Sequence, residues 1–566
     1  MRIGIGTTLG TWRRIARLSA PYTVALLVLA GSPVSAQGVP VATIRALVDA
    51  ARHPWALRPD FSPSLTVVEG LYPGSNPVTL WTDGDRPSPA ARAAINQLLA
   101  APEHGLDSGD YDAALLDSLA ARLGDLAPDD RTRFDVLLTV DLVRFLDEVR
   151  YGRLRENPFS ATPRQADPGL GTLVSGVLAG DSIAPLVRSR EPQLAQYGRL
   201  RAALTRHRAL AADTSLGGLP AAQFLWPGAE YDSLSRLART LVAAGDLTPD
   251  SAPWGTTYEG PVVDAVRRFQ QRHALAADGV LGPATLAALN APVSEQVRGI
   301  ELALERLRWV PPIGSERFLV VNVPAFQLVA FDSASAAAPS LSMRVVVGHP
   351  PDRLTPLLFE ELRYVEFLPY WNVPWSIQVG EILPRLEVNP GYLRSHDMEL
   401  VTRKGRVVGD TISPELMVRL RRGELRLRQR PGPLNSLGRV NFIFPNAESV
   451  YLHDTPRTER FAAAQRDFSH GCISVEDPGT LAEWVLRGEP RWTADAVRAA
   501  MSGTTTRRVL VGKPIPVLLY YTTAVVRADG SVWFYPDLYG HDRELAAALE
   551  ADRTLTAPLP GPSGPR

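Results

Sequence analysis

The one cysteine of this chain lies in a short segment with the residues that could make it reactive. Cys472 follows Ser469, His470 and Gly471, and His453 lies one strand-like segment upstream. A thiol becomes a nucleophile at neutral pH when a nearby imidazole accepts its proton, or when another positive field stabilises the thiolate. The glycine lets the backbone turn sharply, so the N–H groups of Gly471 and Cys472 are candidates for stabilising an oxyanion. The segment therefore predicts nucleophilic catalysis at Cys472, with His453 or His470 as the imidazole.

Two other interpretations of this segment compete with nucleophilic catalysis. A metal could bind to His453, Asp454, His470 and Cys472, but these residues lack the regular spacing of zinc ligands. A lone cysteine can also be a small buried apolar residue. A single cysteine excludes an intramolecular disulfide and any site built from several cysteines. We therefore expect a thiol nucleophile, no metal and no other cofactor.

Short strands are expected to position this segment. Runs rich in β-branched residues and bounded by turns occur at 318–323, 325–331, 343–348, 441–444 and 449–452. Two more runs, at 516–526 and 531–535, are joined by the hairpin-type turn Asp529-Gly530. This pattern predicts a mainly β catalytic domain over 316–545, followed by a C-terminal tail at 546–566.

The stretch 373–435 interrupts this pattern because it is rich in Pro, Arg and Glu. Ser413 is suited to cap a helix whose first residue is Pro414, so a helix is expected over 414–422. The stretch is interpreted as a partly helical insertion that could cover a site on the β domain.

The preceding half of the chain has helical periodicity. In 88–101 and 131–151, apolar residues recur at steps of three and four, with Asp141 at the margin of the second stripe. Residues 40–227 are therefore predicted to form a helical scaffold domain. Residues 228–292 read as three short helices with a glycine-containing turn at 278–283, which predicts a separate small module. The whole chain is predicted to be a multi-domain α+β protein.

The N-terminus has the order of an export signal. Arginines precede an apolar stretch at 22–30, and Val34-Ser35-Ala36 then offers small residues for cleavage. Residues 1–36 are therefore expected to be a signal peptide, although an uncleaved anchor would have a similar order. The apolar stretch is shorter than the roughly 20 residues of a membrane helix, so no transmembrane segment is expected after cleavage.

The charge balance limits the range of partners. The chain has 60 basic and 60 acidic residues, so its formal net charge is zero. This argues against a protein that binds polyanions over a broad surface, and nucleic acid is not an expected partner.

Two sets of motifs resemble known families. His453, fifteen residues and then Ser-His-Gly-Cys resemble the signature of the YkuD-type L,D-transpeptidases, cysteine enzymes of the bacterial cell wall. Tyr370-Trp371-Asn372-Val373-Pro374, the segment 431–439 and Phe444-Pro445-Asn446 are similar to the large, multi-domain YcbB-like subgroup. Residues 228–292, through their motif residues at 265–289, resemble the small three-helix peptidoglycan-binding module. The resemblance implies a helical scaffold, this module, and a mainly β YkuD-like domain with a capping insertion.

The resemblance also implies residue roles. Cys472 would be the nucleophile and His453 the proton acceptor and donor, oriented by the backbone carbonyl of Asp454. Ser469, His470 and Gly471 would shape the nucleophile loop and its oxyanion donors. Substrate contacts would come from Tyr370, Trp371, Asn372 and Tyr451. The family usually has Arg or Asn two residues after the cysteine, where this sequence has Ser474.

The implied reaction is the formation of 3→3 cross-links between peptidoglycan stem peptides. Cys472 would form a thioester with the donor stem, and the amine of an acceptor stem would resolve it. Water as acceptor would make the protein an L,D-carboxypeptidase, and a lipoprotein amine would make it an attachment enzyme. The sequence is also compatible with a non-catalytic wall-binding protein and, less well, with a metal-dependent peptidase. The resemblance implies a periplasmic location.

Overall fold

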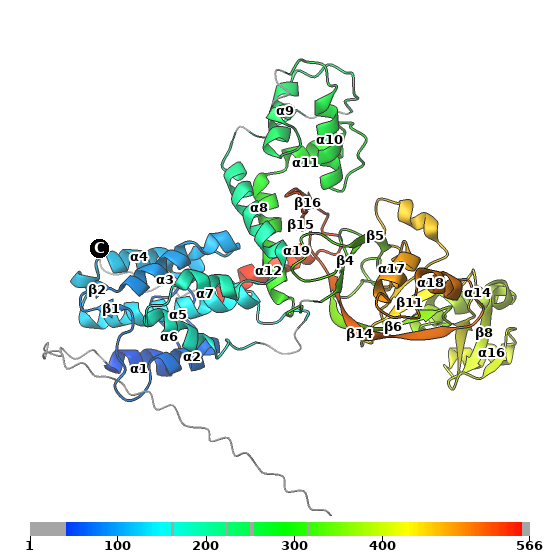
Figure 1. Ribbon diagram of the computed structural model, residues 1–566, viewed down its shortest axis with the longest axis horizontal. Helices are drawn as coiled ribbons and strands as arrows, with labels where there is room; N and C mark the ends of the chain where they lie inside the picture. Colours follow the sequence, from blue (N-terminus) through cyan, green and yellow to red (C-terminus); the bar gives the residue numbers. More distant parts are fainter. Residues whose placement is uncertain are drawn as a thin grey trace, which may run out of the picture. The chain divides into compact units, whose positions relative to one another are not determined.

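The computed structural model describes residues 41–159, 164–214, 216, 218–220, 224–249, 254–314 and 316–556 (Figure 1). The predicted signal peptide at 1–36 lies outside the described residues, as does 557–566 of the predicted tail. Within the described residues, no helix is both long and apolar enough to cross a membrane.

The C-terminal part is built on a closed barrel of eight strands, in the order β11-β12-β13-β5-β4-β3-β14-β6. These strands are β3 (Phe318–Asn322), β4 (Gln327–Phe331), β5 (Leu341–Val346), β6 (Leu358–Phe367), β11 (Val440–Ile443), β12 (Leu452–His453), β13 (Ile473–Val475) and β14 (Arg507–Tyr520). Alternating residues such as Leu319, Val365 and Phe442 are fully buried and fill one core. The mainly β prediction is therefore confirmed.

One predicted strand is displaced. The run 449–452 was expected to be extended, but β12 begins only at Leu452. Ser449 has a φ of 55°, in the left-handed region, and the side chain of Asn446 hydrogen-bonds to both backbone groups of Val450. A turn held by this asparagine therefore replaces the first half of the predicted strand.

Two helices close over the barrel core. These helices, α17 (Pro478–Val485) and α18 (Ala494–Met501), lie side by side, and their apolar faces join the same buried cluster (Figure 1). Each begins with a side-chain cap, in which Asp477 accepts from the N–H of Thr480 and Thr493 accepts from that of Ala496. A separate hairpin, β15 (Ala524–Val526) with β16 (Val532–Phe534), follows β14 and turns at the predicted Asp529-Gly530.

The insertion has its own sheet and its own core. The sheet order is β7-β10-β8-β9. Its elements are β7 (Trp371–Asn372), α13 (Trp375–Ile377), the π-helix η6 (Gln378–Ile382), α14 (Leu383–Val388), α15 (Tyr392–Ser395), β8 (Met398–Thr402), β9 (Val407–Gly409), α16 (Pro414–Arg421) and β10 (Leu425–Gln429). Ser413 caps α16 as predicted, because its hydroxyl accepts from the N–H of Leu416. Leu386, Leu400 and Leu427 lie in a buried cluster separate from that of the barrel.

The N-terminal part is helical, as predicted. Its long central helix, α5 (Pro128–Tyr151), is buried on nearly all sides by its neighbours. The other helices of this part are α1 (Val41–Ala50), α2 (Leu65–Leu71), α3 (Pro89–Leu99), α4 (Ala113–Ala121), α6 (Leu170–Leu178), α7 (Ile183–Arg190) and α8 (Ala195–Ala211). Asp141, expected at the margin of the α5 stripe, is fully buried instead, where it pairs with Arg144 at 3.0 Å.

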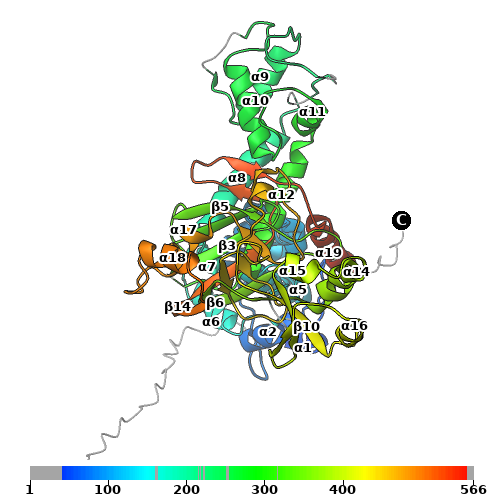
Figure 2. The same ribbon diagram turned by 90° about the vertical axis from the view of Figure 1, so that its right-hand side faces the viewer.

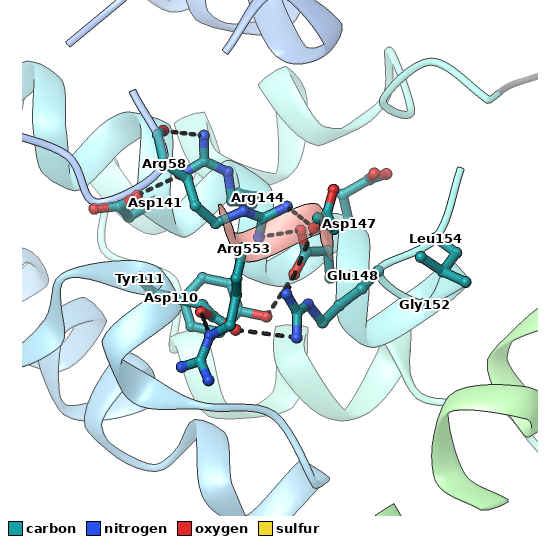
Figure 3. A network of polar contacts seen from close by, with 12 residues as sticks. Arg58, Asp110, Tyr111, Asp141, Arg144, Asp147, Glu148, Gly152, Leu154 and Arg553 are labelled. Carbon is teal, nitrogen blue, oxygen red and sulfur yellow. Dashed lines mark hydrogen bonds and ion pairs between the residues drawn. The ribbon is translucent and has the colours of Figure 1, made fainter. Parts of the chain in front are cut away.

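Figure 3 shows a buried network of charged residues around α5. Arg58 pairs with Glu148 at 2.7 Å, and the Tyr111 hydroxyl donates to the other oxygen of Glu148. Arg553, from the C-terminal helix α19 (His541–Thr556), pairs with the fully buried Asp110 at 2.7 Å. Buried charges persist only when they are paired in this way. The network therefore joins the last helix of the chain to the helical domain.

The small module consists of α9 (Leu234–Ala243), α10 (Pro261–Arg272) and α11 (Pro283–Asn290), which lie together in both views (Figure 1, Figure 2). The three predicted helices are thus present. The Gln270 amide fixes the intervening turn, since it donates to Asp278 and accepts from the N–H of Gly279, whose φ is 77°. Helix α12 (Val293–Trp309) follows the module and packs against α8.

Candidate active site

Parallel pairing of β12 and β13 brings the histidine and cysteine segments together. Leu452 pairs with Ile473 and His453 pairs with Ser474. The N–H of Ile473 also donates to the Tyr451 carbonyl at 3.0 Å, which extends the contact toward the start of β13. Cys472 stands directly before this strand, so the barrel register sets it beside the strand that carries His453.

The His453 ring is buried and held in one orientation. Its Nδ1 lies 2.5 Å from the backbone carbonyl of Asp454. A carbonyl only accepts, so Nδ1 carries the hydrogen and Nε2 keeps the lone pair. Burial lowers the pKa of His453 to about 4, although the bond to the Asp454 carbonyl opposes the shift. At neutral pH the ring is therefore uncharged and able to accept a proton.

The Asp454 carboxylate has another function. Its two oxygens accept from the N–H groups of Arg439 and Thr455, both at 2.7 Å. Burial raises the pKa of this carboxyl, against the effect of these two backbone bonds. The side chain thus fixes the turn before β11, and only the backbone carbonyl of Asp454 contacts the histidine.

The Cys472 thiol is also uncharged at neutral pH. Burial raises its pKa above the ordinary value, and a backbone hydrogen bond from Tyr451 opposes this only in part. Among the described residues, its hydrogen-bond acceptor is the Ser449 carbonyl at 3.8 Å, not the ring of His453. The arrangement is a neutral thiol next to a neutral imidazole.

The backbone around the cysteine is tightly held. We call residues 469–472 the SHGC loop. The Ser469 hydroxyl donates to the Cys472 carbonyl at 2.5 Å and accepts from the N–H of Gly471 at 3.2 Å. Gly471 has a φ of 113°, a conformation that favours glycine. The N–H of Gly471 is thus occupied, whereas among the described residues the N–H of Cys472 has no hydrogen-bond acceptor.

A second loop, residues 347–355, supports the SHGC loop. Ser469 pairs with Gly348, and the Thr355 hydroxyl donates to the Gly471 carbonyl at 2.8 Å. The Tyr539 hydroxyl in turn donates to the Gly348 carbonyl at 2.6 Å. A Cβ at Gly348 would lie 1.9 Å from the Arg353 carbonyl, so only glycine fits there.

The insertion contacts the SHGC loop through one carboxylate. Glu381, on the π-helix η6, hydrogen-bonds to His470 and forms an ion pair with Arg353 at 3.0 Å, both through Oε1. Burial raises the pKa of Glu381, but these two partners outweigh it and leave the pKa below its usual value. Neither Arg353 nor Glu381 was a predicted site residue, because no motif connects positions so distant in sequence.

Three of the predicted substrate residues, Tyr370, Trp371 and Asn372, lie at the start of the insertion, whereas Tyr451 directly precedes β12 beside the cysteine segment. Tyr370 is 40% exposed and lies beneath the guanidinium of Arg428, 4.3 Å from its ring centroid. Trp371 and Asn372 form β7 and pair with β10. The ring of Tyr451 packs edge-on against Phe444. Among the described residues, none of these side chains hydrogen-bonds to His453 or Cys472, and no group of three or more His, Cys, Asp or Glu could hold a metal ion.

Three segments match protein-family models. Residues 66–204 match a "Scaffold domain", residues 232–289 a "Putative peptidoglycan binding domain", and residues 316–517 the YkuD model, described as an "L,D-transpeptidase catalytic domain".

A Haemophilus influenzae protein named "Putative L,D-transpeptidase" is 31% identical over 244 residues, which cover 43% of this chain and 48% of that protein. The chain thus spans about half the length of this curated relative. A crystal structure of an L,D-transpeptidase from Xylanimonas cellulosilytica matches 53% of this chain and 99% of that one, at 15% identity and a TM-score of 0.16.

Proposed function

We propose that this chain forms 3→3 cross-links in peptidoglycan, because residues 316–517 match an L,D-transpeptidase catalytic domain and residues 232–289 match a putative peptidoglycan-binding domain. The donor is a tetrapeptide stem and the acceptor is the side-chain amine of diaminopimelate in a second stem. The protein acts in the periplasm after export. The small module holds it on the glycan, and no metal or other cofactor takes part.

Cys472 is the nucleophile in this proposal. Its sulfur attacks the carbonyl carbon of the donor amide while Nε2 of His453 takes the thiol proton. The N–H of Cys472 stabilises the oxyanion, and that of Gly471 joins it when the Ser469 hydroxyl releases it. The C–N bond then breaks, the leaving amine takes the proton from His453, and a thioester remains.

The second half of the reaction reverses these roles. The acceptor amine attacks the thioester carbonyl, and His453 takes a proton from the amine. The C–S bond breaks, and His453 returns the proton to sulfur. The products are a new amide bond and the original thiol, so atoms and protons balance over the cycle.

The orientation of His453 is the observation that carries this proposal. Its Nδ1 is committed to the Asp454 carbonyl, and its pKa of about 4 leaves Nε2 unprotonated at neutral pH. A base needs this lone pair, and the strand register sets His453 beside the cysteine segment. Catalysis requires this free Nε2 lone pair beside a cysteine segment, whereas binding to the wall does not.

Two measurements test the proposal. Incubation with a carbapenem should add one covalent adduct to the intact protein, and Cys472→Ala should abolish it. His453→Gln should slow adduct formation strongly, whereas His396→Gln, in the insertion, should not. Absence of an adduct on the wild-type protein would overturn the assignment of the nucleophile.

The reaction products distinguish a stem peptide, water and a lipoprotein as the acceptor. With disaccharide-tetrapeptide as substrate, mass spectrometry should show a cross-linked dimer that has lost one terminal residue. A shortened monomer alone would indicate an L,D-carboxypeptidase, and an adduct formed only with an added lipoprotein would indicate an attachment enzyme. Either result would replace the cross-linking assignment.

A further inference from the structure

Two N–H donors converge on one carboxylate oxygen next to the SHGC loop. Nε2 of His470 and a guanidinium nitrogen of Arg353 both contact Oε1 of Glu381. The low pKa of Glu381 means that this oxygen belongs to a carboxylate, which only accepts hydrogen bonds. Nε2 of His470 therefore donates, and both groups present N–H donors to the same point. Such a pair of donors is a site for a carboxylate.

Both donors are fixed relative to the thiol. His470 lies two residues before Cys472 in the SHGC loop. Arg353 belongs to the 347–355 loop, which Thr355 links to Gly471 and Gly348 links to Ser469. The backbone N–H of Arg353 also donates to the His349 carbonyl at 3.1 Å. The backbone segments that carry the two donors are therefore linked directly to the SHGC loop, and this link does not involve Glu381.

Glu381, by contrast, belongs to a different unit. It lies on the π-helix η6, whose neighbours pack into the separate buried cluster of the insertion. The side chains of Arg353, His470 and Glu381 are 46%, 34% and 26% exposed, so all three are open to exchange with a ligand. An ion pair this exposed is weak, and a competing carboxylate can displace it at little cost. Glu381 can thus leave the donors without disturbing the barrel or the insertion core.

We propose that Arg353 and His470 form the site for the C-terminal carboxylate of the donor stem peptide, and that Glu381 fills this site when no substrate is bound. The inference rests on the proposed function, since it identifies the carboxylate as belonging to the peptide that acylates Cys472. The carboxylate lies near the scissile bond, because His470 is so close to the nucleophile. Its entry displaces Glu381 and releases the contact between the insertion and the SHGC loop.

Binding to Cys472→Ala proteins tests the site without requiring turnover. The probes are a disaccharide-tetrapeptide with a free C-terminal carboxylate and the same compound with a C-terminal carboxamide. The carboxylate form should bind roughly tenfold more tightly, as expected for a charge-assisted hydrogen bond in place of a neutral one. Adding Arg353→Gln should bring the two affinities within about twofold, and Arg353→Lys should retain part of the difference. Equal binding of both probes to the Cys472→Ala protein would overturn the proposal.

The variant at Glu381 separates this role from a purely structural one. Glu381→Gln removes the competing charge, so the carboxylate form should bind several-fold more tightly and the carboxamide form should not. Glu387→Gln is the matched control, since Glu387 pairs with Arg421 within the same insertion. Weaker binding of both probes to the Glu381→Gln protein would show that Glu381 only holds the insertion in place, and would also overturn the proposal. Thermal melting of each variant checks that it is folded.

The two proposals can fail separately. If wild-type protein neither turns over the carboxylate probe nor forms an adduct, the proposed function is wrong, and the binding comparison still reports on the site. If turnover occurs but the two probes bind equally, the function holds and the carboxylate site does not.

Discussion

Alkylation of Cys472 by iodoacetamide should accelerate about tenfold for each pH unit between pH 6 and 8, because only the thiolate reacts. An ordinary thiol is about 3% ionised at pH 7, from a pKa of about 8.5. Burial raises the pKa of Cys472, so its ionised fraction is smaller still. The chain has one cysteine, and the extent of labelling therefore reports this residue alone. The native protein should react more slowly at pH 7 than the same chain in urea.

The protonation state of His453 leads to a more specific prediction for the alkylation of Cys472. With a pKa of about 4, only about one imidazole in a thousand is protonated at pH 7, so no imidazolium is present to stabilise a thiolate. His453→Gln should leave the alkylation profile within about twofold of wild type. The same variant should lower turnover by a factor of about 10² to 10⁴, the usual contribution of a general base.

Two results would refute this reasoning. A plateau of alkylation below pH 6 that disappears in His453→Gln would reveal a thiolate–imidazolium pair, in which each partner shifts the other's pKa. An acid limb of kcat/KM near pH 6.5 would show that His453 titrates like an exposed histidine. The neutral pair instead predicts that this limb lies near pH 4. Mass spectrometry of labelled protein and steady-state kinetics from about pH 3 to pH 9 provide both measurements.

Three further predictions concern the buried ion pairs, the space around Gly348 and the protonation of His53. Glu148→Gln should lower the free energy of unfolding by about 3 kcal/mol in urea titrations, because it breaks a buried ion pair. Asp130→Asn breaks a half-exposed ion pair and should lower the free energy of unfolding by less than about 0.5 kcal/mol. Equal losses in the two variants would contradict the stabilising role of the buried network. Gly348→Ala should reduce turnover strongly and lower the melting temperature, because a Cβ at this position meets the Arg353 carbonyl. Gly409 has open space around it, so Gly409→Ala should change neither turnover nor the melting temperature. Full activity of the Gly348→Ala protein would show that the 347–355 loop is not rigid. The pKa of His53 is about 4 in the folded protein, whereas the ordinary value, expected in the unfolded chain, is 6.5. The unfolded chain therefore binds the proton more readily. The free energy of unfolding should fall by up to about 3 kcal/mol as the pH drops from 6.5 toward 4. His53→Asn should flatten this dependence, and an unchanged slope in chemical denaturation would assign it to other groups.

The sequence predicted the elements whose signals are local. Strands β3 and β5 show as β-branched runs, and α16 shows through its cap and first proline, so periodicity and capping locate them. The segment with Cys472 and His453 was identified in the same way, from residue types at short spacing. These features depend on residues that are close together in the sequence, so they can be recognised without the structure.

The sheet of the insertion was missed because its signal is mixed. Strand β10 reads Leu-Arg-Leu-Arg-Gln, with leucines buried and alternate arginines partly exposed, and the charged residues hid its alternation within a stretch rich in Arg and Glu. The contacts of Glu381 were missed for a different reason. Its partners lie on two barrel loops, one before and one long after it in sequence, and only the closed barrel brings those loops together. A contact of this kind has no local signature.

The uncharged states of Cys472 and His453 also affect how fast the thiol is oxidised outside the cytoplasm, where the proposed function places this protein. Oxidation of cysteine begins from the thiolate, so a half-buried thiol that stays protonated resists it. A permanently ionised nucleophile would react faster but would also be oxidised faster, and this chain has no second cysteine to form a reversible disulfide with it. With a raised thiol pKa and an uncharged His453, the thiolate is a small fraction of the protein at neutral pH. Peroxide should therefore inactivate the wild-type protein slowly at pH 7 and markedly faster at pH 9, and bound substrate should not accelerate the loss. Rapid inactivation at pH 7 that matches the unfolded chain would show that burial does not protect the thiol.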